Sequence, residues 1–265
     1  MADIDPYFGD EDLRRLQQAQ DARVAEHRET PGAVIHARTF SSDDPEALGR
    51  DMLRARLETD GRVTLRGATD EAVAEAEARL GPSRVFRHHW DLFMADAAMI
   101  ETACRPIAEA GLPDGLVRVP DDDVDDALLK QAQAFMDAQG VSPFSTDALA
   151  GRLFPARMVV LKDKGGGIAA TGFAAMTHNR FSPFSGVAWV GLIAVAPALR
   201  GRAMGTYVDA ISNLAALDAL GASGTMEFVA ADNQPSRRML ETCGLRHVTG
   251  RSVTMFSASD ARLTR

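Results

Sequence analysis

Cysteine and long apolar runs are both scarce in this sequence. The chain has 265 residues and only two cysteines, Cys104 and Cys243, so a disulfide framework is not expected to hold the fold together. The longest apolar stretch, residues 187–199, is too short to cross a bilayer. The acidic N-terminus shows no secretory signal. We therefore expect a cytoplasmic protein without a membrane partner.

Basic residues are also fewer than acidic ones. Lys and Arg number 29 against 37 Asp and Glu, the net charge is −8 at pH 7, and no long basic run is present, so no nucleic-acid partner is expected. His88 and His89 are adjacent on an expected strand, where they would point to opposite faces, and no further ligands stand nearby at metal-binding spacing. The aspartate-rich segment 121–126 is typical of the acidic start of a helix. We therefore expect no metal site.

The rest of the composition is that of an ordinary globular protein, with 46% hydrophobic and 25% charged residues and enough length for two domains. A break at 113–115 predicts a boundary, with an N-terminal α/β or mostly helical unit of unknown role over 1–114. No motif is recognisable in that unit. Its pattern predicts helices over 10–30, 46–57, 69–80 and 95–110, and strands over 33–37, 61–66 and 84–90.

The second range, 115–265, alternates strands and helices in a regular order. Strands are predicted at 116–119, 158–162, 168–177, 188–195, 225–230 and 246–256. Helices are predicted at 127–138, 147–153 and 206–220, with one more between Asn233 and the stop residue Gly244. The tetrapeptide Ser-Pro-Phe-Ser occurs twice, at 142–145 and 182–185.

A strand, a loop of small residues and a helix follow one another near residue 200. The loop Arg-Gly-Arg-Ala-Met-Gly-Thr, residues 200–206, can direct several backbone N–H groups at one anion, helped by the helix dipole and by Arg200 and Arg202. No Gly-Lys-Ser/Thr follows, and the three-glycine dinucleotide spacing is absent. The loop therefore predicts a pyrophosphate site of another kind.

This loop resembles the acyl-CoA loop of the GNAT family, the Gcn5-related N-acetyltransferases, which reads Arg/Gln-x-x-Gly-x-Gly/Ala after a strand ending in Val-x-Pro. The segments Val195-Ala196-Pro197 and Arg200-Gly201-Arg202-Ala203-Met204-Gly205 fit this pattern. Ala203 departs from it, because the family's first glycine usually sits there. Since alanine is small, we expect the loop to function if Ala203 keeps a negative φ.

A second segment supports the same resemblance. Asn233-Gln234-Pro235-Ser236, continuing to Gly244-Leu245, is similar to the family's Asn-x-x-Ala/Ser…Tyr-Glu-x-x-Gly-Phe segment. The two motifs stand in the family's order, and the resemblance covers about residues 115–258. It implies the GNAT fold: an α/β fold with a mixed, mostly antiparallel central sheet and helices on both faces.

The resemblance also implies a function, transfer of an acetyl group from acetyl-CoA directly to an amine of a small molecule or protein. One alternative is a catalytically degenerate module that binds acyl-CoA or only a partner. Another is that residues 1–114 are a relic of a second GNAT domain. The acceptor and the oligomeric state are not predicted. The implied cofactor-binding residues are Ile193, Ala194, Val195, Arg200, Gly201, Arg202, Ala203, Met204, Gly205, Thr206, Asn233 and Ser236.

The acid and base of such a reaction are poorly marked. The family's usual tyrosine falls on Leu240, and the glutamates that many members carry fall on Trp189 or Phe228. Glu227 is the only carboxylate inside the two central strands, and a buried carboxylate is costly unless it is used or paired, so Glu227 is the predicted base. The alternative is a salt-bridged or exposed glutamate. His178 is a weaker candidate.

Overall fold

One continuous nine-stranded sheet forms the centre of the molecule, in the order β1-β2-β9-β3-β8-β7-β6-β5-β4. The computed structural model describes residues 5–80 and 85–259. β1 pairs parallel with β2, and β7 pairs parallel with β8, while the other neighbours are antiparallel. The strands are β1 Ser41–Ser42, β2 Arg62–Thr69, β3 Phe86–Asp96, β4 Leu116–Arg118, β5 Ala156–Asp163, β6 Ile168–Ala175, β7 Val187–Val195, β8 Gly224–Val229 and β9 Arg246–Ser257.

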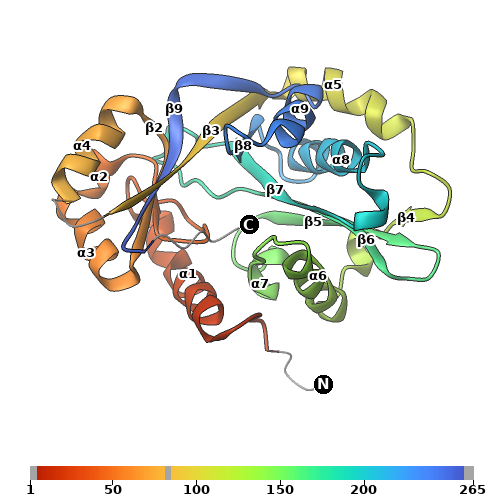
Figure 1. The fold of residues 1–265 in the computed structure, drawn as a ribbon, viewed down its shortest axis with the longest axis horizontal. Helices are drawn as coiled ribbons and strands as arrows, with labels where there is room; N and C mark the ends of the chain where they lie inside the picture. Colours follow the sequence, from red (N-terminus) through yellow and green to blue (C-terminus); the bar gives the residue numbers. More distant parts are fainter. Residues whose placement is uncertain (1–4, 81–84, 260–265) are drawn as a thin grey trace.

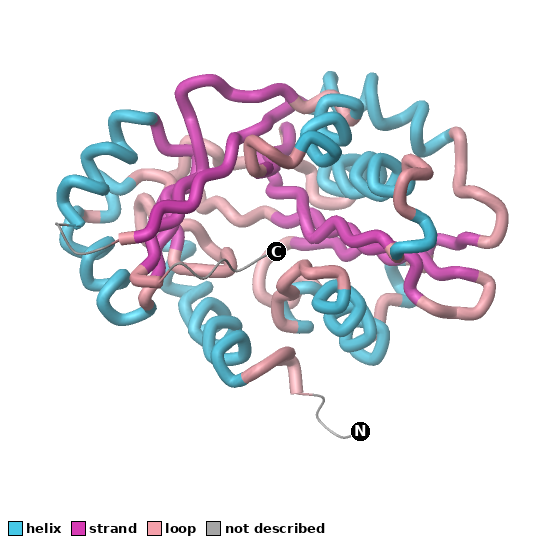
Figure 2. Tube along the Cα trace, in the orientation of Figure 1, coloured by secondary structure: helices cyan, strands magenta, loops and turns pink. Residues whose placement is uncertain are grey.

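Helices cover both faces of this sheet (Figures 1 and 2). α5, α8 and α9 lie on one face, and α1, α6 and α7 on the other, while α2, α3 and α4 flank the end formed by β2 and β9. The helices are α1 Glu11–Glu29, α2 Pro45–Leu48, α3 Arg50–Asp60, α4 Asp70–Leu80, α5 Ala97–Glu109, α6 Asp126–Ala138, α7 Thr146–Leu149, α8 Met204–Asp218 and α9 Gln234–Thr242, with short 3₁₀ helices η1 Asp121–Asp123 and η2 Pro197–Leu199. The predicted fold class, a mostly antiparallel sheet between helices, is confirmed.

α8 lies close against the sheet because β6 carries a glycine beneath it. A Cβ on Gly172 would lie 2.2 Å from the Ser212 Oγ and 2.8 Å from a Val208 methyl carbon, both on α8. Any larger residue at this position would push the helix outward. The acidic run 121–126 forms η1 and the start of α6, where the Asp125 side chain accepts a hydrogen bond from the Leu128 N–H at 2.8 Å. That run therefore caps a helix, as its position predicts.

Three elements of the N-terminal range differ from their predictions. The helix predicted over 46–57 is divided at Gly49 into α2 and α3. The predicted strand 33–37 forms only isolated bridges among the described residues, Ala33 with Ser42 and Val34 with His178, and the short strand β1 follows this segment. The predicted strand 84–90 extends to Asp96 as β3, although Arg84 lies outside the described residues. Most residues of 87–91 are polar. β3 is largely exposed at this start and mostly buried from Leu92 to Ala95.

β3 joins the two halves of the chain. It lies between β8 and β9, pairing Phe93 with Glu227 on one side and with His247 on the other. α5 follows β3 directly, and its Ile100 and Cys104 share a buried cluster with Leu214 of α8. The boundary at 113–115 stays a prediction, but these pairings give a reason to expect that both ranges fold together.

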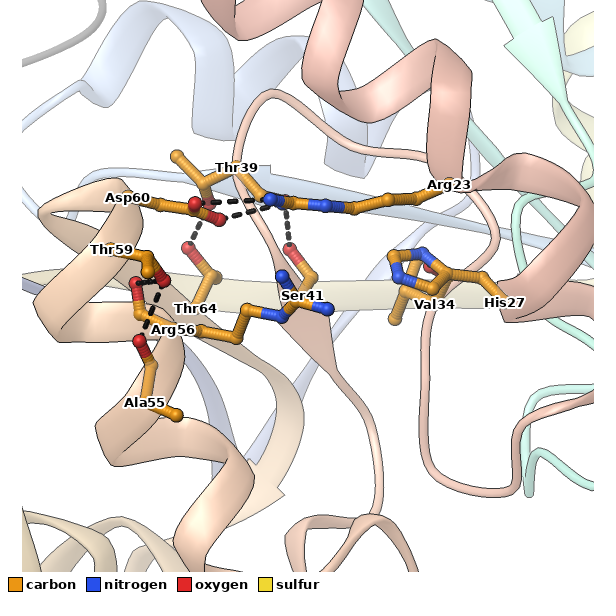
Figure 3. A network of polar contacts seen from close by, with 10 residues as sticks. All are labelled: Arg23, His27, Val34, Thr39, Ser41, Ala55, Arg56, Thr59, Asp60 and Thr64. Carbon is orange, nitrogen blue, oxygen red and sulfur yellow. Dashed lines mark hydrogen bonds and ion pairs between the residues drawn. The ribbon is translucent and has the colours of Figure 1, made fainter.

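α1 is tied to α3 and to the segment 33–42 by a polar network (Figure 3). Both guanidinium nitrogens at the end of Arg23 donate to the Asp60 carboxylate at the end of α3, at 2.6 and 3.0 Å. The Nδ1 atom of His27 lies 3.0 Å from the Val34 carbonyl oxygen. These contacts fix α1 beside residues 33–42, the segment that connects it to β1 and β2.

We predict that residues 115–265 expressed alone do not fold cooperatively. Without β3, the facing edges of β8 and β9 lose their partners, and unpaired edges favour aggregation. The measurement is urea unfolding followed by circular dichroism, with the full chain as the control. A sharp unfolding transition of the isolated 115–265 range would show instead that it is a separate domain, as the break at 113–115 predicts.

Candidate functional site

β7 and β8 start side by side and then part. Their pairing covers three residue pairs, the last being Trp189 with Met226. Beyond this point β7 continues to Val195 and β8 to Val229. Within residues 5–80 and 85–259, the backbone edges that face each other there have no strand partner, so an extended ligand could pair with them. We call this opening, between residues 190–195 and 227–229, the strand gap.

A bulge in β7 marks the start of the strand gap. Leu192 has a φ of 54°, and the pairing of β7 with β6 shifts register between Phe173 and Thr171. The Thr171 hydroxyl donates to the Leu192 carbonyl oxygen at 3.2 Å and holds the bulge in place. Because a bulge bends its strand and ends regular pairing, this feature turns β7 away from β8.

The loop after β7 presents unpaired amide groups at the start of α8. In the described part of the chain, the backbone N–H groups of residues 201–206 have no hydrogen-bond acceptor. Ala203 caps α8 with a φ of 56°, so the expected negative φ is wrong. Free N–H groups at a helix start attract an anion, so these residues fit the diphosphate of a nucleotide-type cofactor.

The two loop arginines differ in their surroundings. Arg200 Nε donates to the Val195 carbonyl oxygen at 3.1 Å, and its Nη2 donates to the Gln139 Oε1 at 2.8 Å, so this side chain fastens the loop to β7 and to the end of α6. Arg202 is exposed and forms no ion pair with a described residue. Arg202 is therefore the loop cation that remains available to a ligand.

The second motif has a local structural role. The Asn233 side-chain oxygen accepts from the Ser236 N–H at 3.2 Å and caps α9, and Gly244 follows the helix with a φ of 91°. The predicted helix start and stop are confirmed. Binding of a cofactor by Asn233 and Ser236 stays a prediction.

Glu227 points toward α8. Its Oε1 accepts from the Asn213 Nδ2 at 3.1 Å, and only 4% of the residue is exposed. Burial, followed by the charge of Asp209 on α8, raises the pKa of Glu227 well above its usual range, and burial raises the pKa of Asp209 to about 6. Neighbouring strand residues face opposite sides, so Phe228 points toward the α6–α7 face instead. This orientation counts against Glu227 as the base, and its catalytic role stays a prediction.

His178 lies on the α6–α7 side, beside the N-terminal half. It is 6% exposed, its ring lies 5.5 Å from that of Phe184, and neither ring nitrogen makes a hydrogen bond of normal geometry with a described residue. Burial and then the nearby charge of Arg66 lower its pKa well below 6.5. A neutral imidazole can accept a proton, but no contact directs His178 into the strand gap, so its role as a base also stays a prediction.

An aromatic wall lines the sheet face opposite α8 at the strand gap. Trp189 stacks on Phe228 at 6.4 Å, and it contacts Phe173 at 6.2 Å and Phe144 at 5.7 Å. Phe144 belongs to the first Ser-Pro-Phe-Ser copy, between α6 and α7. Arg66 from β2 lies over Phe228 and Trp189, at 5.0 and 5.8 Å from the ring centroids. The sequence motifs do not include Arg66, and its only signal is a charge within a short alternating strand.

Two further findings concern the described residues only. No helix among them is both long and apolar enough to cross a bilayer. No group of three or more His, Cys, Asp or Glu side chains among them is arranged to hold a metal ion.

Comparisons with known proteins identify the fold. No protein-family model and no curated protein matches the chain. A solved GCN5-related N-acetyltransferase from Kribbella flavida matches with a TM-score of 0.57 and 14% identity, covering 92% of this chain and 94% of the other. A GCN5-related N-acetyltransferase-like protein from Streptococcus suis matches with a TM-score of 0.53 and 11% identity, covering 91% and 99%. A tandem GNAT protein from the clavulanic acid biosynthesis pathway gives 0.50 and 16%, covering 84% and 76%.

The chain therefore has the GNAT fold. The resemblance seen in the two motifs is confirmed at the level of the fold, and these matches extend it from the second range to most of the chain.

We predict that Ala203→Gly stabilises the protein. A left-handed conformation costs a non-glycine residue about 1 kcal/mol or more, and glycine removes this cost. The free energy of unfolding, measured in urea, should rise by about 1 kcal/mol. Ala198→Gly, in the neighbouring η2, is the matched control and should lower stability, because its backbone is not left-handed. Equal effects at both positions would contradict the prediction.

We predict that Glu227→Gln flattens the dependence of stability on pH. Above a pH of about 4.5 the unfolded chain releases the Glu227 proton while the folded protein keeps it, so stability falls as pH rises toward the raised pKa. The slope is about 1.4 kcal/mol per pH unit for one proton. Urea unfolding at several values between pH 5 and 8 measures it.

The matched control is Glu241→Gln, because Glu241 lies exposed on α9. The control should keep the slope of the original protein. An unchanged slope in Glu227→Gln would show that Glu227 is not a buried, protonated acid.

Proposed function

We propose that this protein is an N-acetyltransferase that transfers an acetyl group from acetyl-CoA directly to an amine. One observation carries the proposal: the strand gap lies next to a helix start whose N–H groups have no acceptor among the described residues, on the fold shared with N-acetyltransferases. An extended chain could pair with the free edge of β7 while its diphosphate meets residues 200–206.

The residues proposed for the cofactor have distinct tasks. The backbone of Ile193, Ala194 and Val195 would bind the extended arm, since their strand edge faces the gap. Residues 201–206 would bind the diphosphate through N–H groups, with Arg202 adding positive charge. When bound, acetyl-CoA supplies an acetyl group activated as a thioester. Backbone N–H groups near the Leu192 bulge would stabilise negative charge on its carbonyl oxygen.

The acceptor amine must lose a proton before it can attack. Leu240 occupies the position of the family's usual tyrosine, and it is 2% exposed within a buried cluster. Glu227 and His178 remain the predicted bases, and the Glu227→Gln variant tests the first. A general base contributes on the order of 100-fold, so a loss of that size at unchanged acetyl-CoA affinity would support Glu227. Near-normal turnover would leave only its structural role under α8.

A second candidate function is acyl-CoA binding without turnover. It is favoured by the apolar Leu240 and by the orientation of Glu227 away from the aromatic wall. Tight acetyl-CoA binding with no CoA release across a broad set of amines would support it. We also propose a cytosolic location, which the two buried free thiols of Cys104 and Cys243 support.

We predict that Gly205→Glu abolishes acetyl-CoA binding while the protein stays folded. A carboxylate in the first turn of α8 suits the helix dipole but repels a diphosphate at the same place. Calorimetric titration with acetyl-CoA should show at least a tenfold loss of affinity, which is about 1.4 kcal/mol. Thermal unfolding checks the fold.

Gly205→Gln has the same size without the charge and serves as the control. It separates electrostatic repulsion from crowding against Met239, whose Sδ would lie 3.3 Å from a Cβ at this position. Full acetyl-CoA affinity in Gly205→Glu would refute the assignment of the loop.

A further inference from the structure

Arg66 is a buried cation at the point where β7 and β8 part. It comes from β2, which β9 and β3 separate from β8, and only 6% of the residue is exposed. Its guanidinium lies over Trp189, in the last β7–β8 pair, and over Phe228, two residues beyond that pair on β8. The charge is therefore placed beside the strand gap, on the face opposite α8.

The hydrogen bonds of Arg66 are incomplete. Nη1 donates to the Thr177 hydroxyl at 3.0 Å, but among the described residues the buried Nε has no acceptor and no carboxylate forms an ion pair with this guanidinium. Asp43 is the carboxylate with the strongest electrostatic effect on Arg66, but one of its oxygens accepts from the Ser182 hydroxyl and the other has no partner. A buried charge without a contacting partner is costly, and an anionic ligand would remove this cost.

A second guanidinium strengthens the positive field on this face. Arg38 lies over the Phe144 ring at 5.8 Å, and its Nε donates to the Ser142 carbonyl oxygen at 3.2 Å. Burial lowers the pKa of Arg38 and of Arg66 to about 10, and both still carry a charge at neutral pH. A cationic acceptor would meet repulsion here, and an anionic one would meet attraction.

We propose that Arg66 binds a carboxylate of the acceptor, so the acceptor is a small amine that also carries a carboxylate, such as a free amino acid. This inference rests on the proposed acetyl transfer. A guanidinium can hold a carboxylate through two parallel hydrogen bonds, and the aromatic wall of Trp189, Phe228 and Phe144 suits an apolar body. The guanidinium lies 5.8 and 5.0 Å from the ring centroids of Trp189 and Phe228, which stand where β7 and β8 part, so we expect the carboxylate and the reacting amine to be only a few bonds apart.

The test compares Arg66→Gln with the unaltered full chain. Acceptors are the common amino acids, their primary amides and their decarboxylated amines, with CoA release as the readout. For the best amino acid we expect kcat/KM to fall about 100-fold in the variant, the size typical of removing one partner of a buried charge pair. For the matching amide we expect no change, whereas a merely structural role for Arg66 would lower both equally.

Arg251→Gln is the matched control variant. Arg251 also lies over an aromatic ring, Phe184 at 5.9 Å, and its Nη1 also donates one hydrogen bond, to the Gly67 carbonyl oxygen at 2.7 Å. Among the described residues, Arg66 is the cation that lies over Trp189 and Phe228, whereas Arg251 lies over Phe184. We expect it to keep the preference for the amino acid over its amide.

Direct binding gives a second readout that does not depend on turnover. N-acetyl derivatives of the same amino acids are titrated calorimetrically into the folded protein, and Arg66→Gln should lose binding while Arg251→Gln keeps it. Equal use of acids and amides, a preference for ethanolamine phosphate, or no binding by any N-acetyl amino acid would overturn the carboxylate proposal.

These results also distinguish the acetyltransferase function from the carboxylate-binding role of Arg66. If acetyl-CoA binds and only amines without a carboxylate react, the acetyltransferase function stands and the role of Arg66 is refuted. If acetyl-CoA does not bind, the proposed function fails, and the N-acetyl amino acid titration still decides whether Arg66 holds a carboxylate.

Discussion

The insertion of β3 between β8 and β9 is the constraint on which the rest of the structure depends. β3 supplies hydrogen bonds to both neighbours, and it connects the N-terminal strands to the sheet that carries the strand gap. It also brings β2 and β9 onto the same sheet, so that Arg66 reaches the rings of Trp189 and Phe228. The N-terminal range therefore contributes a buried guanidinium, that of Arg66, beside the strand gap.

The alternation of side chains along β8 divides the site chemically. Thr225 and Glu227 point to α8, where Asn213 bonds both side chains, while Met226 and Phe228 join the face opposite α8. Polar groups on the α8 side are consequently enclosed under a helix. The opposite side offers aromatic rings and guanidinium groups next to the opening. Consecutive residues on β8 face opposite sides of the sheet. Glu227 is therefore enclosed under α8, while its neighbour Phe228 belongs to the aromatic wall.

The same alternation explains how far the sequence could predict this molecule. The elements after residue 115 follow clear apolar periods and caps, and the structure has them within a few residues of their predicted bounds. The strand order could not be predicted, because nothing local in β3 indicates that it pairs with strands more than a hundred residues later. The face to which Glu227 points and the reach of Arg66 both depend on that pairing. The loop 200–206 was accessible to sequence reasoning because its chemistry is local.

Departures from ordinary protein geometry gather around the strand gap. Leu192 and Ala203 are the two non-glycine residues with positive φ among those described, and they stand at the two ends of the segment that leads from the bulge to α8. Arg66, a buried cation without an ion-pair partner in the described part of the chain, lies at the same opening. Strain and an incompletely paired charge both reduce stability, and they persist where the surrounding fold enforces them. The positive φ of Leu192, the positive φ of Ala203 and the charge of Arg66 each reduce stability, and all three lie around one opening. A binding role for this opening accounts for the three together.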